Sequence, residues 1–138
     1  MNCEGSITIF DGNSRLTLTR LGEPEEDYPA SSYPTRIQIN SGPFSTYVEA
    51  PAQSYLNFRK ALLNLHETLS GQARLEFWNQ VHLIILTGEE NGSIKLTVKI
   101  ADSFSPSRAK LTVEMGLDQS YLPKIIAGLG QTFPKSIE

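Results

Sequence analysis

Hydrophobic and polar residues alternate with a period of two in several short stretches of the chain. In the clearest stretch, residues 93–101, every second residue is aliphatic and lysine or threonine stands between. This period places the apolar side chains on one face of a β-strand. Alternating or β-branched stretches predict eight strands, at residues 6–10, 14–21, 35–40, 44–50, 73–78, 81–87, 93–101 and 108–115.

The segments between these strands carry turn residues. Asp11-Gly12 and Asn91-Gly92 are strong hairpin signals, so we expect neighbouring strands to pair antiparallel. Residues 102–107 are expected to form a loop. Residues 22–34 contain three prolines and four acidic residues, which makes this segment the longest predicted loop.

A different period appears at residues 51–71, where apolar residues recur every three or four positions. This spacing predicts an amphipathic helix with one wide apolar face. Pro51 is tolerated in a first turn, Ser54 is a second candidate N-cap, and Gly71 can end the helix in a left-handed conformation. We expect the flanking strands to cover the apolar face.

A weaker second helix is predicted at residues 117–133. Asp118 is a candidate N-cap, with Leu117 as part of a hydrophobic staple, but Pro123 also makes Ser120 a candidate. Gly128 and Gly130 each cost about 1 kcal/mol relative to alanine, so this helix needs tertiary packing.

The order of elements is four strands, a helix, four strands and a helix. We therefore expect an α+β fold in which an antiparallel sheet of about eight strands carries both helices on one face. The length of 138 residues suits a single domain spanning residues 1–138.

Charge limits the partners that the chain can bind. The net charge is −3, and residues 1–27 hold six acidic residues against two basic ones. Binding to a nucleic-acid backbone requires clustered lysine and arginine, so we expect no nucleic acid partner. A basic protein is the partner that this charge favours.

No catalytic or metal-binding motif is present. His66 and His82 are most simply structural, a Cys3–histidine pair has no third orienting group, and no zinc or phosphate-loop spacing occurs. We therefore predict no enzyme activity, no cofactor and no metal. The apolar runs are too short for a membrane span, and the N-terminus has no secretory pattern. With a single cysteine, a bacterial cytoplasmic location is expected.

The long acidic loop is the best local indication of a binding surface. Its acids are most simply a solvated loop, but the tyrosines beside them are residues enriched at protein interfaces. The predicted partner-binding residues are Glu23, Glu25, Glu26, Asp27, Tyr28 and Tyr33.

The layout of the whole chain resembles the WapI-type immunity proteins, which are partners of bacterial polymorphic toxins. The resemblance rests on RLTLTRL, the loop GEPEEDYP, the hairpin TRIQINSGPFSTYVEA, the helix SYLNFRKALLNLHETLSG, ARLEFW…VHLIIL, SIKLTVKI and the closing TFP. It departs at Trp78-Asn79-Gln80, where an acidic, proline-containing segment would be typical. The resemblance implies binding without catalysis, namely occupation and blocking of a cognate, basic toxin domain.

Two other functions stay open at this stage. One is a small-ligand-binding module with an apolar pocket between the sheet and the helices. The other is an enzyme, which would require His66 or His82 to meet a carboxylate in a cleft. Oligomeric state has no signal in the sequence.

Overall fold

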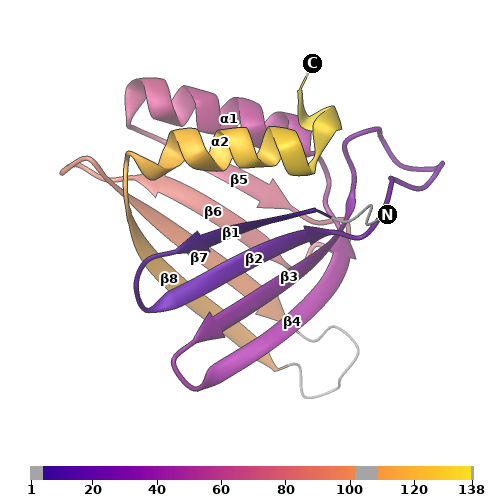
Figure 1. Cartoon of the computed structure of the whole chain (residues 1–138), viewed down its shortest axis with the longest axis horizontal. Coiled ribbons are helices and arrows are strands. Elements are labelled where there is room, and N and C mark those ends of the chain that lie inside the picture. The colour runs from indigo at the N-terminus through magenta and orange to yellow at the C-terminus, as the bar shows by residue number, and fades with distance from the viewer. Residues whose placement is uncertain (1–4, 102–108, 138) are drawn as a thin grey trace.

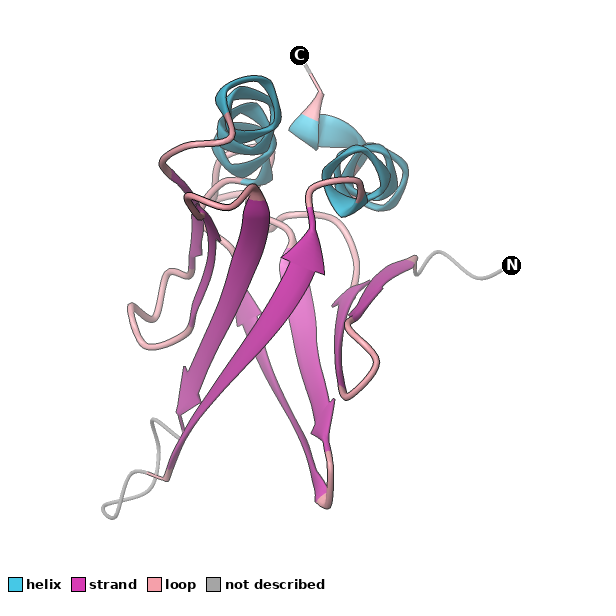
Figure 2. Ribbon diagram, turned by 90° about the vertical axis from the view of Figure 1, so that its left-hand side faces the viewer, coloured by secondary structure: helices cyan, strands magenta, loops and turns pink. Residues whose placement is uncertain are grey.

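Eight antiparallel strands form two four-stranded sheets, and two helices lie side by side along one side of them (Figures 1 and 2). This is a computed structural model, and it describes residues 5–101 and 109–137. Neither described helix is long and apolar enough to cross a membrane. The elements are β1 Ser6–Phe10, β2 Ser14–Arg20, β3 Pro34–Ser41, β4 Phe44–Pro51, α1 Tyr55–Thr68, β5 Gln72–Glu76, β6 Leu83–Gly88, β7 Ser93–Ala101, β8 Lys110–Asp118, α2 Tyr121–Thr132 and a 3-10 turn at Pro134–Ser136.

The predicted α+β class, the eight antiparallel strands and their order around the helices are confirmed. The eight strands divide into sheets β1-β2-β3-β4 and β5-β6-β7-β8, so each sheet follows the chain order. The division falls at α1, because the helix separates β4 from β5 and prevents a hairpin between them. Where the two sheets meet, Ala52 and Phe77 form an isolated antiparallel bridge.

Helix α1 is shorter than the predicted segment 51–71. It begins after Ser54, whose side chain accepts a hydrogen bond from the Asn57 backbone N–H at 3.1 Å. This is the N-cap geometry that satisfies an orphan donor of the first turn. Pro51 ends β4 instead, and the left-handed C-cap residue is Leu69 (φ 56°), with Gly71 also at positive φ (90°) two residues later. The predicted helix was therefore right in its apolar face and too long at both ends.

Helix α2 also begins later than predicted. Strand β8 continues to Asp118, so Leu117 is a buried strand residue and the expected staple with Leu122 does not start a helix there. Ser120 is the N-cap residue, although its side chain makes no capping hydrogen bond.

The helices cover both sheets, because α1 packs on β5 and β6 while α2 packs on β1 and β8. The Arg59 Nε atom on α1 donates to the Ile126 carbonyl oxygen of α2 at 3.1 Å, which ties the two helices together. Apolar side chains from all eight strands and both helices form one buried cluster. Each such aliphatic or aromatic side chain contributes about 1.5–3 kcal/mol on burial, so the shared core holds the two sheets together.

Candidate functional site

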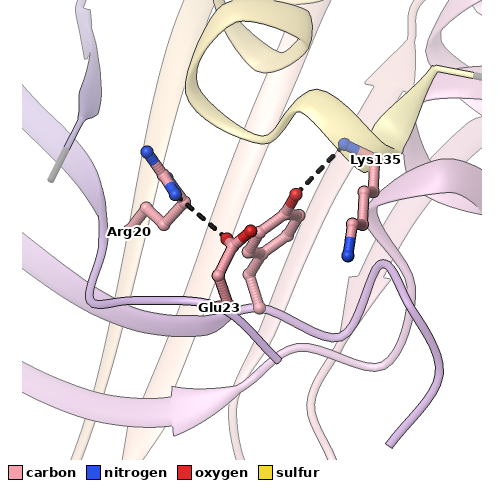
Figure 3. Close-up of polar contacts among 4 residues, drawn as sticks. Arg20, Glu23 and Lys135 are labelled. Atoms are coloured by element: carbon pink, nitrogen blue, oxygen red, sulfur yellow. Dashed lines mark hydrogen bonds and ion pairs between the residues drawn. The ribbon is translucent and has the colours of Figure 1, made fainter. Parts of the chain in front are cut away.

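The acidic loop runs from the end of β2 to the start of β3. Its first acid, Glu23, forms an ion pair with the Arg20 guanidinium, with 3.1 Å between Glu23 Oε2 and Arg20 Nη1 (Figure 3). Backbone N–H groups of Tyr28 and Ser32 then donate to the Glu25 and Pro29 carbonyl oxygens at 3.0 Å each, which folds the loop into two successive turns. The side chains of four acids stand exposed on these turns: Glu23, Glu25, Glu26 and Asp27.

An aromatic pair stands beside the acids. The ring of Tyr28 lies parallel to the ring of Trp78, with 5.7 Å between centroids and 8° between planes. Both side chains face solvent, since Tyr28 is 37% exposed and Trp78 is 42% exposed. Exposed, paired aromatic rings offer apolar contact area at low entropic cost, which is why such residues concentrate at binding hot spots.

Hydrogen bonds hold the Trp78 side chain in this position. The indole Nε1–H donates to the Ser32 hydroxyl oxygen at 3.2 Å, and the Ser32 hydroxyl in turn donates to the Gln53 carbonyl oxygen at 2.6 Å. The Trp78 backbone N–H donates to the Pro51 carbonyl oxygen at 3.1 Å. The ring is therefore preorganised in the free protein, so binding a partner does not require a further loss of conformational entropy to order it.

Tyr33 does not belong to this surface. Its side chain is 1% exposed and packs at a tilt against the rings of Tyr55 and Phe133. The Tyr33 hydroxyl oxygen accepts a hydrogen bond from the Lys135 backbone N–H at 3.1 Å, near the Arg20–Glu23 pair (Figure 3). The prediction of Tyr33 as a partner-binding residue is corrected on this ground, because a tyrosine can anchor a loop to the core as readily as it can face a partner.

The structure thus brings five of the six predicted residues to one exposed loop and adds Trp78, which sequence reasoning did not select. Trp78 lies two residues after the end of β5, far along the chain from Tyr28, so no local pattern joins the two. The departure from the family layout at Trp78-Asn79-Gln80 was the one signal in the sequence that pointed there. We define the acidic–aromatic surface as Glu23, Glu25, Glu26, Asp27, Tyr28 and Trp78.

The histidines lie in unlike environments. His66 is exposed on α1, whereas His82 is 4% exposed, lies edge-on to the Phe77 ring, and accepts a hydrogen bond at Nδ1 from the Ala101 backbone N–H at 3.4 Å. Burial lowers the pKa of His82, so the imidazole is held neutral in the fold. Within residues 5–101 and 109–137, no three His, Cys, Asp or Glu side chains gather in a way that could hold a metal ion. Cys3 lies outside the described residues, as does the predicted loop at 102–107.

A groove of about 920 Å³ lies between β4 and the ends of β7 and β8. The side chains that line it come from these strands and from Asn79 and His82, and none of the lining residues in the described part of the chain belongs to a helix. The groove is therefore not the pocket between sheet and helices that a small-ligand-binding module would use.

Comparison with known proteins gives one match. A family model described as the immunity protein WapI-like family matches residues 7–135 of this chain. No curated protein and no solved structure matches.

Proposed function

The chain belongs to the WapI-like immunity protein family, and on that premise we propose that it binds and neutralises a cognate bacterial toxin without catalysing a reaction. Membership in the family supports an immunity role, and the toxin is the partner that such a role requires. The proposal places the protein in the bacterial cytoplasm, where a chain with one cysteine needs no disulfide to fold.

The observation that carries the proposal is the stacked Tyr28–Trp78 pair among four exposed carboxylates. The aromatic rings supply a rigid apolar anchor, and the exposed acids on the same loop as Tyr28 add negative charge, with Glu23 paired to the Arg20 guanidinium. Such a surface fits a basic protein, because opposite charge steers the encounter and raises the association rate.

The direct test is to co-express the protein with the toxin domain encoded beside its gene. We expect a stoichiometric complex with a Kd on the order of nanomolar, and we expect cells that make the toxin to survive only when this protein is present. Failure to bind or protect against any toxin domain encoded nearby would overturn the proposal.

A charge-reversal pair locates the binding surface. Glu25→Lys/Glu26→Lys should slow association by about tenfold or more, with the difference shrinking at high salt. The matched control is Glu67→Lys/Glu90→Lys, which changes net charge equally at exposed acids on α1 and in the β6–β7 turn. If both double variants slow association to the same degree, the acidic–aromatic surface is not where the toxin binds.

A further inference from the structure

Strand β4 forms one edge of its sheet and is exposed over nearly its whole length. Among the described strands, β3 alone is its neighbour in the sheet. Five of its eight residues are exposed, namely the first four and Glu49. The large side chains of Phe44 and Tyr47 are 64% and 58% exposed. An edge strand is a row of unpaired backbone donors and acceptors, which natural proteins usually cover.

The register between β3 and β4 shows which backbone groups face outward. The Ala52 N–H donates to the Tyr33 carbonyl oxygen at 3.1 Å, so residues 33 and 52 form a hydrogen-bonded pair. In an antiparallel ladder such pairs recur at every second position. With Pro34 opposite Pro51, the inward hydrogen bonds of β4 belong to its even-numbered residues, from Phe44 to Ala50.

The N–H and C=O groups of Ser45, Tyr47 and Glu49 therefore point away from β3. The next odd-numbered residue confirms the parity, since the Pro51 carbonyl oxygen faces outward and accepts the Trp78 N–H at 3.1 Å. Among the described residues, no backbone hydrogen bond is made by the outward groups of Ser45, Tyr47 and Glu49.

These outward groups border the groove between β4 and sheet β5-β6-β7-β8. Across the groove lie the end of β7 and the start of β8, where the half-buried Leu111 adds apolar surface beside the buried Ile100. On β4 itself Val48 packs partly against the core, whereas Thr46 and Phe44 on the same face are exposed. The groove thus has a strand edge on one side and an apolar wall on the other.

We propose that β4 binds an extended segment of the partner protein as an additional strand, with every second side chain of that segment apolar and placed in the groove. The backbone groups of Ser45, Tyr47 and Glu49 would form hydrogen bonds with the segment, and Val48 and Leu111 would contact its apolar side chains. In strand addition, main-chain hydrogen bonds supply affinity and pockets for alternate side chains supply specificity.

One feature favours a partner segment as the occupant. The groove reaches Pro51 and Asn79, which adjoin Trp78, so one partner can cover the acidic–aromatic surface and the groove together. A second copy of this chain, which carries the same strand edge, is the competing occupant, and concentration-dependent protection of the β4 amides would reveal it. Because the partner is the toxin named above, the inference rests on the proposed function.

The test uses peptides, so that it does not depend on the toxin. A phage-displayed library of ten-residue peptides, apolar at every second position and randomised between, is selected on the full-length protein. Enriched peptides are then synthesised and their Kd values measured. We expect amide hydrogen exchange at Ser45, Tyr47 and Glu49 to slow at least tenfold with peptide bound, while Thr46 and Val48 are already protected.

Three variants separate the backbone from the side chain. Tyr47→Pro removes an outward N–H, so it should leave the fold intact and weaken peptide binding at least tenfold. Tyr47→Ala keeps the N–H and should bind within about threefold of wild type, since a backbone bond needs no ring. Thr46→Pro removes an inward ladder bond to Ile39 and should lower the melting temperature, which checks the assigned register.

The proposal is overturned if no peptide is enriched, or if enriched peptides bind Tyr47→Pro as tightly as wild type. It is also overturned if Ser45, Tyr47 and Glu49 are protected without peptide in a concentration-dependent way, because the occupant is then a second copy. A positive peptide result with no toxin complex would reject the proposed function and leave strand addition standing.

Discussion

The rings of Tyr55 and Phe133 stack face to face inside the core, with 3.7 Å between centroids and 11° between planes. Tyr55 is the first residue of α1, and Phe133 follows the last residue of α2, so the stack joins the start of one helix to the end of the other. The Tyr55 hydroxyl also shares a 2.9 Å hydrogen bond with the Thr35 hydroxyl on β3. Burial raises the pKa of Tyr55, and the phenol therefore stays protonated at ordinary pH.

Removing the Phe133 ring should destabilise the whole fold. Phe133 is fully buried, and Phe→Ala at such a site leaves a cavity and costs about 3–5 kcal/mol. Urea denaturation of Phe133→Ala measures this loss of unfolding free energy. Phe10→Ala is the control, because Phe10 is 42% exposed and its loss should cost much less. Equal losses for the two variants would contradict the stacked core.

The two serine caps should differ in strength. The Ser54 side chain accepts the Asn57 N–H at 3.1 Å, whereas Ser120 makes no side-chain capping bond. Ser54→Ala should therefore lower the free energy of unfolding by about 1 kcal/mol, and Ser120→Ala by a few tenths at most. Chemical denaturation of both variants measures the two losses of unfolding free energy. A larger loss for Ser120→Ala than for Ser54→Ala would mean that the cap of α2 forms and that of α1 does not.

The two helix glycines should respond differently to alanine. A Cβ on Gly128 would lie 2.7 Å from the Cδ1 atom of Ile7 in the buried face of β1, whereas a Cβ on Gly130 would meet the Cδ1 atom of Ile137 at 2.9 Å. Ile137 is 50% exposed and can move aside. Gly130→Ala should thus gain up to about 1 kcal/mol of helix propensity, while Gly128→Ala should gain nothing or lose stability. Melting temperatures of the two variants compare these effects, and a more stable Gly128→Ala would refute the close packing.

The aromatic pair should dominate toxin affinity. Trp78→Ala removes the larger, hydrogen-bonded ring and Tyr28→Ala its stacking partner, so we expect each to weaken binding by about 2 kcal/mol, or roughly thirtyfold. Phe10→Ala removes an equally exposed ring outside the surface and should bind like wild type. Isothermal titration with the toxin domain gives the three Kd values, and an unchanged Kd for Trp78→Ala would exclude this surface.

His82 should make the fold sensitive to mild acid. Burial lowers its pKa below the ordinary 6.5, so the unfolded chain binds more protons between the two pKa values. The free energy of unfolding should therefore fall as pH drops through 6.5, by at most about 1.4 kcal/mol per pH unit from this group, and level off below the folded-state pKa. Denaturation at pH 7.5 and 5.5 should show a smaller fall for His82→Gln than for wild type. His66→Gln is the control, because His66 is exposed.

The positions of most strands could be predicted from the sequence, because alternation is a local property. Ser6–Phe10 and Ser93–Ala101 begin and end where the pattern places them. The ends of the helices could not be placed as well. Leu69 takes a left-handed conformation at the end of α1, two residues before Gly71, whose φ is also positive at 90°.

Local patterns along the chain are enough to specify the α+β class, the order of the elements, the apolar face of α1 and the acidic character of the exposed loop, because all of these follow from the period and charge of neighbouring residues. The three-dimensional fold was needed to establish that the strands divide into two sheets, that Tyr33 is buried, and that Tyr28 meets Trp78. These three outcomes depend on contacts between residues distant in the chain, and no periodicity within one segment can specify which distant side chain will lie against it.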